Sequence, residues 1–504
     1  MAFGGLDIGS SGVKCALYND KGSRIALARR EYDCMAGGGH YELDGSLVWE
    51  KAKEVLREAA AQSKEPVEAI AVSAIGEAGV GLDKRDRVLA PSLMFHDVRG
   101  MEESRLLCEK LGKRRIYEKT GNVPNGTYTI EKLMWIREHE AYYKEIEKFF
   151  LFEDFIIFML TGERGISYSL AARTMAFDIM EKSWDEAVFE AAEVESSLMS
   201  GTFPSGTVIG TLRPKLAGEL GLCKQTKILT GGHDGWCCAL GGGMTDNRAA
   251  INVSGSCETI SVLLDGPRRD GFMMESGYSC IPYIMENTYA TYGLCLTSGS
   301  LIKWFRDRLG GGRSYRELDE SVSDKPSGII VIPDFSVSGT PCFSLDAKGL
   351  LYGLTLDTSA SDIFRALMEG TAFHIRMNME IMEKNGIEIP AVRTVGGAAF
   401  SPLWMQIKAD IWGREVTTVE GGEGGVTGLA MLAGKEAGVF GSLEEGAEKL
   451  IRPGKTYVPN GRYGGYYTET YGMFQEMFAW KRRYGNEFYR TGYRNIGGES
   501  PLHG

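Results

Sequence analysis

The sequence predicts an α/β protein made of two related halves. Its 504 residues exceed what one hydrophobic core usually supports, so two domains are expected. Strand-like apolar runs alternate with stretches of helical spacing, as in mixed α/β folds. A hairpin-like motif near the start recurs in the second half of the chain, which indicates that the two halves share one plan.

In the first half, short apolar runs predict strands at 70–73 and 227–229, and helical spacing predicts helices at 50–62 and 129–138. The apolar run 149–160 contains two acidic residues and is too short to span a bilayer, so we expect a buried helix there.

In the second half, we expect helices at 362–385 and 403–412 and a strand at 393–395. The tail after about residue 441 starts with a helical patch and continues as a run rich in tyrosine and glycine that ends in Pro501. We expect its last stretch to wrap the surface or to move freely.

A glycine-rich polar turn at 241–247 separates the two halves and directly precedes the second hairpin. We place the domain boundary and a hinge there. The predicted domains are 1–247 and 248–504, and the second includes the tail from about residue 441.

The first hairpin places an acidic residue, two hydroxyls and a cation around a tight turn between two apolar runs. Asp7 ends the first run, Ser10 and Ser11 lie in the turn, and Lys14 lies in the returning run. Amides of such a turn can bind phosphate oxygens, and a carboxylate beside it suits Mg²⁺ and its water shell. The alternative is an ordinary hairpin whose glycines only make the turn.

The second hairpin, 249–264, repeats this plan: an apolar strand, the turn Gly255-Ser256, a returning strand and a closing Asp-Gly. Two such turns suggest two related halves that bind one nucleotide, which we take to be ATP.

Asp234 follows the strand 227–229 and precedes a helix-like segment. A carboxylate at such a strand end can accept the proton of an attacking alcohol while a phosphoryl group is transferred. The alternative is that Asp234 caps the helix, because Asp is common at that position.

Two polar clusters in the first half are candidates for binding a polyhydroxylated ligand. Glu77 ends one buried strand, and Asp97 and Arg99 alternate with apolar residues farther along. Carboxylate and guanidinium groups together match hydroxyls that both donate and accept. The alternative is a surface Asp/Arg pair, which is common.

A third glycine turn, 395–402, lies between a strand and a helix, where glycines let a flat base approach the backbone closely. The alternative is an ordinary strand-to-helix connection, which would have a similar sequence. Gly454-Lys455-Thr456 imitates the end of a P-loop, but Lys449 stands where the first glycine must be.

The net charge and the cysteine content argue against several classes of binding partner and cellular location. A net charge of -11 argues against nucleic acid and anionic membrane surfaces. The ten cysteines lack metal-ligand spacing and are expected to be reduced thiols, and no signal peptide is recognisable, so we expect a cytoplasmic protein.

Taken in order along the chain, these motifs resemble the FGGY carbohydrate kinases. The motifs that carry the resemblance are Asp7 to Lys14, Phe95-x-Asp97-x-Arg99, Lys132-x-x-Trp135, Asp154 with Leu160-Thr161-Gly162, Gly232-x-Asp234, Gly255-Ser256, Gly299 with Trp304-Phe305, Gly349 to Gly370, and Gly396-Gly397-Ala398.

The resemblance implies two ribonuclease-H-like domains of the actin-like ATPase type around a central cleft, and transfer of the ATP γ-phosphate to a sugar hydroxyl. It implies that Asp7 holds Mg²⁺ through water and that Asp234 is the general base. Residues that it places at the substrates are Ser10, Ser11, Lys14, Gly255, Ser256, Gly299, Gly397 and Ser401 for ATP, and Glu77, Asp97, Arg99 and Asp234 for the sugar.

We therefore expect an ATP- and Mg²⁺-dependent kinase of a small ketose, such as a pentulose or deoxyhexulose, or of a polyol, with a homodimer as the oligomer to test. The rival hypothesis is an actin-like or chaperone-like ATPase without a sugar substrate, which would use the same hairpins. A catalytically silent sugar sensor is a third alternative.

Overall fold

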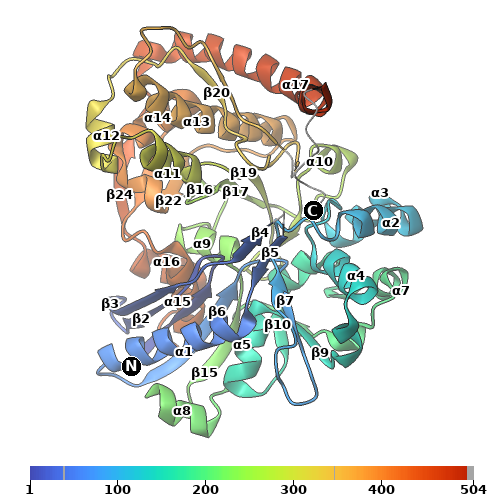
Figure 1. Ribbon diagram of the computed structural model, residues 1–504. Helices are drawn as coiled ribbons and strands as arrows, with labels where there is room; N and C mark the ends of the chain where they lie inside the picture. Colours follow the sequence, from blue (N-terminus) through green and yellow to red (C-terminus); the bar gives the residue numbers. More distant parts are fainter. Residues whose placement is uncertain (38–39, 345–346, 496–504) are drawn as a thin grey trace. The chain divides into compact units, whose positions relative to one another are not determined.

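The computed structural model describes residues 1–37, 40–344 and 347–495 (Figure 1). The chain forms two compact units, and neither is continuous in sequence. The first comprises Met1–Asp246, Leu263–Thr291 and Glu423–Arg452, and the second comprises Asn247–Val262, Tyr292–Gly422 and Pro453–Gly504. The division into domains 1–247 and 248–504 stays a prediction, since the compact units exchange segments across it.

The first unit is built on a six-stranded mixed sheet in the order β14-β15-β6-β1-β2-β3. The central strand β1 pairs in parallel with β6 and antiparallel with β2. Residues of β6 are buried along almost the whole strand, as expected for a strand covered on both faces. The strands are β1 (Ala2–Ile8), β2 (Gly12–Asn19), β3 (Arg24–Glu31), β6 (Val67–Ala74), β14 (Val208–Thr211) and β15 (Lys227–His233).

Helices cover this sheet, and one of them comes from late in the sequence. Helix α15 (Gly424–Glu436) packs so closely that a Cβ atom added at Gly5 or Gly231 would lie 2.3 Å from Leu429. This close packing explains why the late segment belongs to the first unit. The other helices of the unit are α1 (Gly45–Gln62), α2 (Met101–Leu111), α3 (Lys113–Thr120), α4 (Thr129–His139), α5 (Phe152–Thr161), α6 (Tyr168–Ala171), α7 (Glu186–Ala192), α8 (Pro214–Leu220), α9 (Asp234–Gly241), α10 (Gly271–Glu275) and α16 (Leu443–Leu450).

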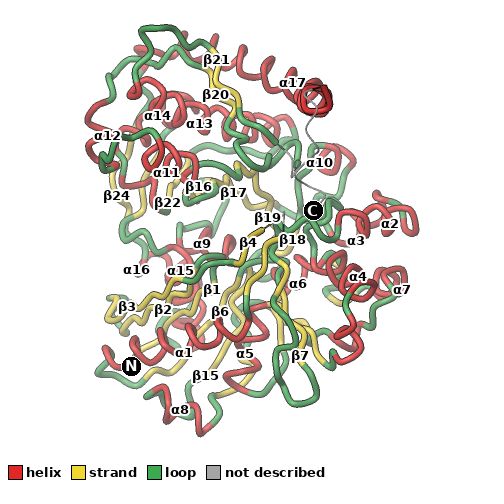
Figure 2. The backbone as a smooth tube through the Cα atoms, viewed as in Figure 1, coloured by secondary structure: helices red, strands yellow, loops and turns green. Residues whose placement is uncertain are grey.

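Short strands in the first unit form small additional pairings (Figure 2). They are β4 (Met35–Gly37), β5 (His40–Leu43), β7 (Gly79–Leu82), β8 (Ser92–Leu93), β9 (Lys148–Leu151), β10 (Gly165–Ser167), β11 (Phe177–Asp178), β12 (Ser183–Trp184) and β13 (Gly201–Phe203). Strand β18 (Ile281–Pro282) instead pairs with β19 (Tyr289–Cys295) in a larger sheet.

The second unit is built on a seven-stranded sheet in the order β18-β19-β17-β16-β22-β23-β24, with β16 and β17 forming the second hairpin. These strands are β16 (Ala250–Ser254), β17 (Glu258–Leu264), β19 (Tyr289–Cys295), β22 (Val392–Val395), β23 (Val416–Val419) and β24 (Pro453–Tyr457), and β20 (Ile330–Ile332) pairs separately with β21 (Leu350–Tyr352). The helices are α11 (Gly299–Arg308), α12 (Tyr315–Ser321), α13 (Ala360–Lys384), α14 (Pro402–Trp412) and α17 (Gly464–Asn495).

The α/β class, both hairpins and the predicted strands and helices named above are confirmed, with one correction. The run 149–160 is not one helix, because β9 ends at Leu151 and α5 begins at Phe152. The described part of the tyrosine- and glycine-rich tail forms the 32-residue helix α17, which was not predicted from the sequence. Its last residues, 496–504, lie outside the described residues.

Helix α17 forms because its aromatic residues recur at helical spacing. Tyr467, Tyr471, Phe474 and Phe478 are all buried and follow one another at intervals of four, three and four residues. Their rings pack on Phe373 of α13 and on one another, so tertiary contacts offset the low helix propensity of glycine and tyrosine. Among the described residues, no helix is long and apolar enough to span a membrane.

Candidate active site

The first hairpin places Asp7 at the end of β1, directly opposite Lys14 on β2. Ser73 Oγ donates to Asp7 Oδ1 at 2.7 Å. Burial raises the pKa of Asp7, and the nearby carboxylate of Glu423 raises it further. The start of α15 approaches this carboxylate so closely that a Cβ at Gly425 would lie 2.8 Å from Asp7 Oδ2.

Lys14 is half-exposed and forms an ion pair with Glu423, Nζ to Oε2 at 3.1 Å. Burial acts to lower the pKa of Lys14, but Glu423 and Asp7 outweigh it and the pKa is raised. Glu423 lies far along the sequence, and no local motif marks it as a partner of Lys14. Lys14 is therefore held as a cation beside the buried carboxylate.

Ser10 and Ser11 are exposed in the turn between β1 and β2. Gly9 N donates to Gly12 O at 2.9 Å, which closes the turn. Tyr32 holds it from the side, because its hydroxyl donates to Gly9 O at 2.5 Å and its amide donates to Ser11 O at 3.2 Å. The two serines are thus free to face a ligand on a fixed backbone.

Asp234 lies where β15 ends and α9 begins, as predicted. It is the first residue of α9, so the preceding His233 occupies the N-cap position instead. Its Oδ1 accepts a bond from its neighbour Gly235 N at 2.6 Å, and 32% of its side chain is exposed. Burial raises the pKa of Asp234 to about 8, with Asp7 and Glu77 adding repulsion.

His233 does not neutralise this carboxylate. Its Nε2 lies 3.4 Å from Asp234 Oδ1, but burial and the nearby Arg173 lower the pKa of His233 to about 3, so the ring is uncharged near neutral pH. A neutral imidazole next to a protonatable carboxyl leaves Asp234 as the group that can take up a proton.

Glu77 follows β6 in a left-handed conformation, with φ of 65°, and is almost fully buried. Arg173 Nε donates to Glu77 Oε1 at 2.7 Å, and Arg173 Nη1 donates to Asn122 Oδ1 at 3.3 Å. Thr129 Oγ1 fixes the backbone by donating to Glu77 O at 2.7 Å. Arg173 was not predicted as a site residue, because nothing in its local sequence indicates a partner 96 residues away.

Asp97 and Arg99 form one buried polar unit. Both Asp97 oxygens accept bonds from Arg99, and Asp97 Oδ2 also accepts from Tyr41 N at 2.7 Å. Burial acts to raise the pKa of Asp97, but these hydrogen bonds outweigh it and the pKa is lowered. Arg99 also pairs with Glu42 at 2.8 Å, so a direct sugar contact by either side chain stays a prediction.

The second unit contains a pocket of about 1210 Å³. It brings together the five residues of this unit that the sequence assigns to ATP, namely Gly255, Ser256, Gly299, Gly397 and Ser401. Three aromatic side chains in its lining are exposed, Phe400 at 75%, Tyr315 at 41% and Trp304 at 39%. Such flat apolar surfaces suit an aromatic base.

The backbone of this pocket is built by close approach of glycine. A Cβ at Gly299 would lie 2.3 Å from Gly255 O, and Gly299 N donates to that oxygen at 3.1 Å. The start of α11 therefore rests on the turn of the second hairpin. Ser401 caps α14 by accepting from Trp404 N, and its hydroxyl donates to Asp319 Oδ2 at 2.6 Å.

A fully buried ion pair lies beneath this turn. Lys408 Nζ is 2.5 Å from Glu258 Oε1 and also donates to Asn252 Oδ1 at 2.9 Å and Ser254 Oγ at 3.1 Å. Burial lowers the pKa of Lys408. Ser298 Oγ donates to Glu258 Oε2 at 2.7 Å, so one network connects both hairpin strands, α14 and the start of α11.

Comparison with known proteins agrees with this organisation. The N-terminal domain model of the FGGY family of carbohydrate kinases matches residues 2–241, and its C-terminal domain model matches residues 235–437. The chain is 26% identical to the xylulose kinase of Bacillus subtilis strain 168 over 94% of this chain and 96% of that protein.

Solved structures show the same fold. The gluconate kinase of Lactobacillus acidophilus superposes with a TM-score of 0.88 at 21% identity, covering 97% of this chain and 99% of that one. The xylulose kinase of Rhodospirillum rubrum superposes with a TM-score of 0.85 at 24% identity, covering 96% of this chain and 99% of that one. The predicted two-domain, actin-like fold is thus confirmed, and the chain belongs to the FGGY family of carbohydrate kinases, enzymes that phosphorylate sugars with ATP.

Proposed function

We propose that the chain phosphorylates a small ketose, with Asp234 as the general base. The observation that carries this proposal is the raised pKa of Asp234 at the junction of β15 and α9. A base with a pKa of about 8 is ionised in a useful fraction near neutral pH and is strong enough to accept the proton of a sugar hydroxyl as the phosphoryl group arrives.

We propose that Asp7 holds Mg²⁺, through water or directly. Burial raises the pKa of both Asp7 and Asp234, and repulsion from the Asp7 carboxylate raises the pKa of Asp234 further. A divalent cation bound there would relieve the repulsion, and Mg²⁺ prefers a few carboxylates with retained waters. When bound, the ion supplies positive charge to the phosphates, and Lys14 adds a point charge beside it.

We propose that the nucleotide occupies the pocket of the second unit. Trp304 and Phe400 offer faces for the adenine, and the turn Gly255-Ser256 offers backbone amides for phosphates. The buried pair of Lys408 and Glu258 fixes that turn from below. These contacts bind and orient the nucleotide, so in this scheme the protein contributes mainly position and charge.

We propose that the sugar lies near Glu77, Arg173 and Asp234 of the first unit. Glu77 and Asn122 set the orientation of the Arg173 guanidinium, because Nε donates to Glu77 Oε1 at 2.7 Å and Nη1 donates to Asn122 Oδ1 at 3.3 Å. Asp97 and Arg99 stabilise the neighbouring loop. Similarity to xylulose kinases makes xylulose the first ketose to test, and similarity to a glycerol kinase and a gluconate kinase makes glycerol and gluconate the alternative substrates.

The test is a panel of sugars with ADP release as the readout, followed by identification of the phosphorylated carbon. A pentulose should give sugar-dependent ADP release that exceeds release with glycerol and gluconate. ADP release that does not depend on any sugar would contradict the proposal and favour the ATPase alternative.

We further propose that the protein works in the cytoplasm, with a homodimer as the oligomer to test. Cys15, Cys237, Cys280 and Cys295 are buried free thiols, which suits a reducing compartment. Sedimentation of the purified chain would give the oligomeric state.

A further inference from the structure

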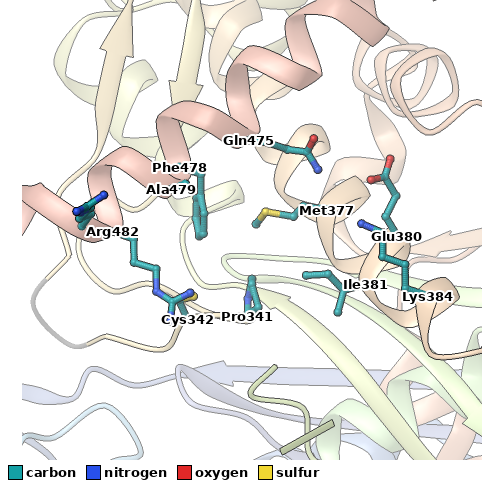
Figure 3. A pocket seen from close by; sticks show the side chains of 11 residues that line it. Pro341, Cys342, Met377, Glu380, Ile381, Lys384, Gln475, Phe478, Ala479 and Arg482 are labelled. Carbon is teal, nitrogen blue, oxygen red and sulfur yellow. The ribbon is translucent and has the colours of Figure 1, made fainter. Parts of the chain in front are cut away.

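We propose that the second unit carries a separate site for a small amphipathic anion, between α13 and α17 (Figure 3). A pocket of about 580 Å³ lies there, within the range of sites for small organic ligands. Its lining includes Pro341, Met377, Ile381, Lys384, Phe478 and Arg482.

The floor of this pocket is formed by apolar side chains of the two helices and of a neighbouring loop. Along α17 the buried aromatic residues pack on α13, and Phe478 is the last of them. Beyond it, Met377 and Ile381 of α13 and Pro341 of a neighbouring loop line an open space instead of a closed interface. Met377 and Phe478 are each only 7% exposed, so the floor suits a ring or a short hydrocarbon.

The rim of the pocket is positively charged. Lys384, Arg482 and Arg483 all line it, and within the described part of the chain none of the three forms an ion pair with a carboxylate. The acidic residue in the lining is Glu380, and it is already engaged: Oε1 accepts from Arg376 Nε at 3.0 Å and Oε2 accepts from the Tyr471 hydroxyl at 2.9 Å.

These three cations pair with no carboxylate among the described residues, on a chain whose net charge is -11, so the rim is a local concentration of positive charge. Guanidinium and ammonium groups beside an apolar floor recognise a phosphate or carboxylate head that carries an apolar body. The structure therefore favours an amphipathic anion over a neutral ligand or a cation.

The site is distinct from the nucleotide pocket but shares a helix with it. Phe364 and Met368 of α13 line the nucleotide pocket, and Met377 and Lys384 of the same helix line this one. Met368 and Met377 are separated by about 14 Å along the helix, at 1.5 Å per residue. A ligand that fixes the end of α13 can therefore change nucleotide affinity, which would make the site regulatory.

The experiment is calorimetric titration of the full chain with phenyl phosphate, with and without saturating ADP. Inorganic phosphate, which lacks the apolar body, and benzyl alcohol, which lacks the charge, are the comparison probes. The test variant combines Lys384→Gln and Arg482→Gln, and the matched control is Lys325→Gln, an exposed lysine of the same unit outside both pockets.

We expect phenyl phosphate to bind in the presence of ADP and to bind more tightly than either comparison probe. Loss of charged hydrogen-bond donors should weaken binding about 10-fold or more in the double variant, with less than about a 2-fold change in the control. Phenyl phosphate should also change the Kd of ADP by at least about 3-fold in the wild type but not in the double variant.

Three outcomes would overturn the proposal: no heat of binding, equal binding by the wild type and the double variant, or complete displacement by ADP. The last would place phenyl phosphate in the nucleotide pocket. An unchanged Kd of ADP would refute the regulatory role. None of these readouts requires turnover, so a failure of the ketose kinase assignment would be seen separately, in the sugar panel.

Discussion

Replacing Asp234 by asparagine should abolish most activity and at the same time stabilise the first unit at alkaline pH. The side chain keeps its shape, so the fold is retained, but it can no longer accept a proton. Base catalysis contributes about 10² to 10⁴ in rate, so kcat should fall by about 100-fold or more.

The stability effect follows from the raised pKa. The folded protein binds this proton up to about pH 8, whereas an unfolded aspartate releases it near pH 3.8. The folded state therefore holds an extra proton between these values, and stability falls as pH rises through this window. Protonation of Asp234 is a stabilising contribution that is complete below the unfolded pKa and is lost by about pH 8.

The size of the effect can be bounded. A shift from 3.8 to about 8 corresponds to at most about 6 kcal/mol. Because 32% of the side chain is exposed, solvent screening reduces this, and we expect about 2 kcal/mol at pH 8. For a unit of this size, that is roughly 4 to 8 °C in Tm.

The assay is calorimetric melting of the wild type and Asp234→Asn at pH 5 and pH 8, with a chelator present so that no divalent cation is bound. The increase in Tm of the variant over the wild type should be larger at pH 8 than at pH 5. Asp20→Asn, which changes an exposed aspartate in the turn after β2, is the control and should show no such difference. Parallel melting profiles for the wild type and Asp234→Asn, or near-normal kcat in the variant, would refute the reasoning.

Three further variants test other parts of the site. Asp7→Asn should lower kcat and weaken the Mg²⁺ dependence of turnover, and an unchanged metal titration would argue against its role. Gly425→Ala should lower kcat about 10-fold without loss of Tm, because the new Cβ would lie 2.8 Å from the Asp7 carboxylate. The control is Gly465→Ala, whose new Cβ would have no atom within 4 Å and which should leave kcat unchanged. Lys408→Met should cost about 3 to 5 kcal/mol in urea unfolding by leaving a buried charge unpaired, and adding Glu258→Gln should recover part of it; no recovery would contradict the ion-pair explanation.

The hairpins, the strand before Asp234 and the order of the family motifs could all be predicted from the sequence. These features are local, because apolar alternation, turn glycines and a carboxylate at a strand end each depend on a few consecutive residues. Neighbouring residues in the sequence therefore suffice to predict them. The same patterns placed Gly255, Gly299 and Gly397, which the structure then brings into one pocket.

Tertiary structure alone decided which distant groups meet these residues. Glu423 reaches Lys14, and Arg173 reaches Glu77, because helices from far along the chain pack on the first sheet. Helix α17 was missed for a related reason: its sequence is a poor helix former, and contacts with α13 supply the stability. The pKa of Asp234 likewise depends on the tertiary structure. Burial and carboxylates distant in sequence raise it, and both result from the way the chain folds.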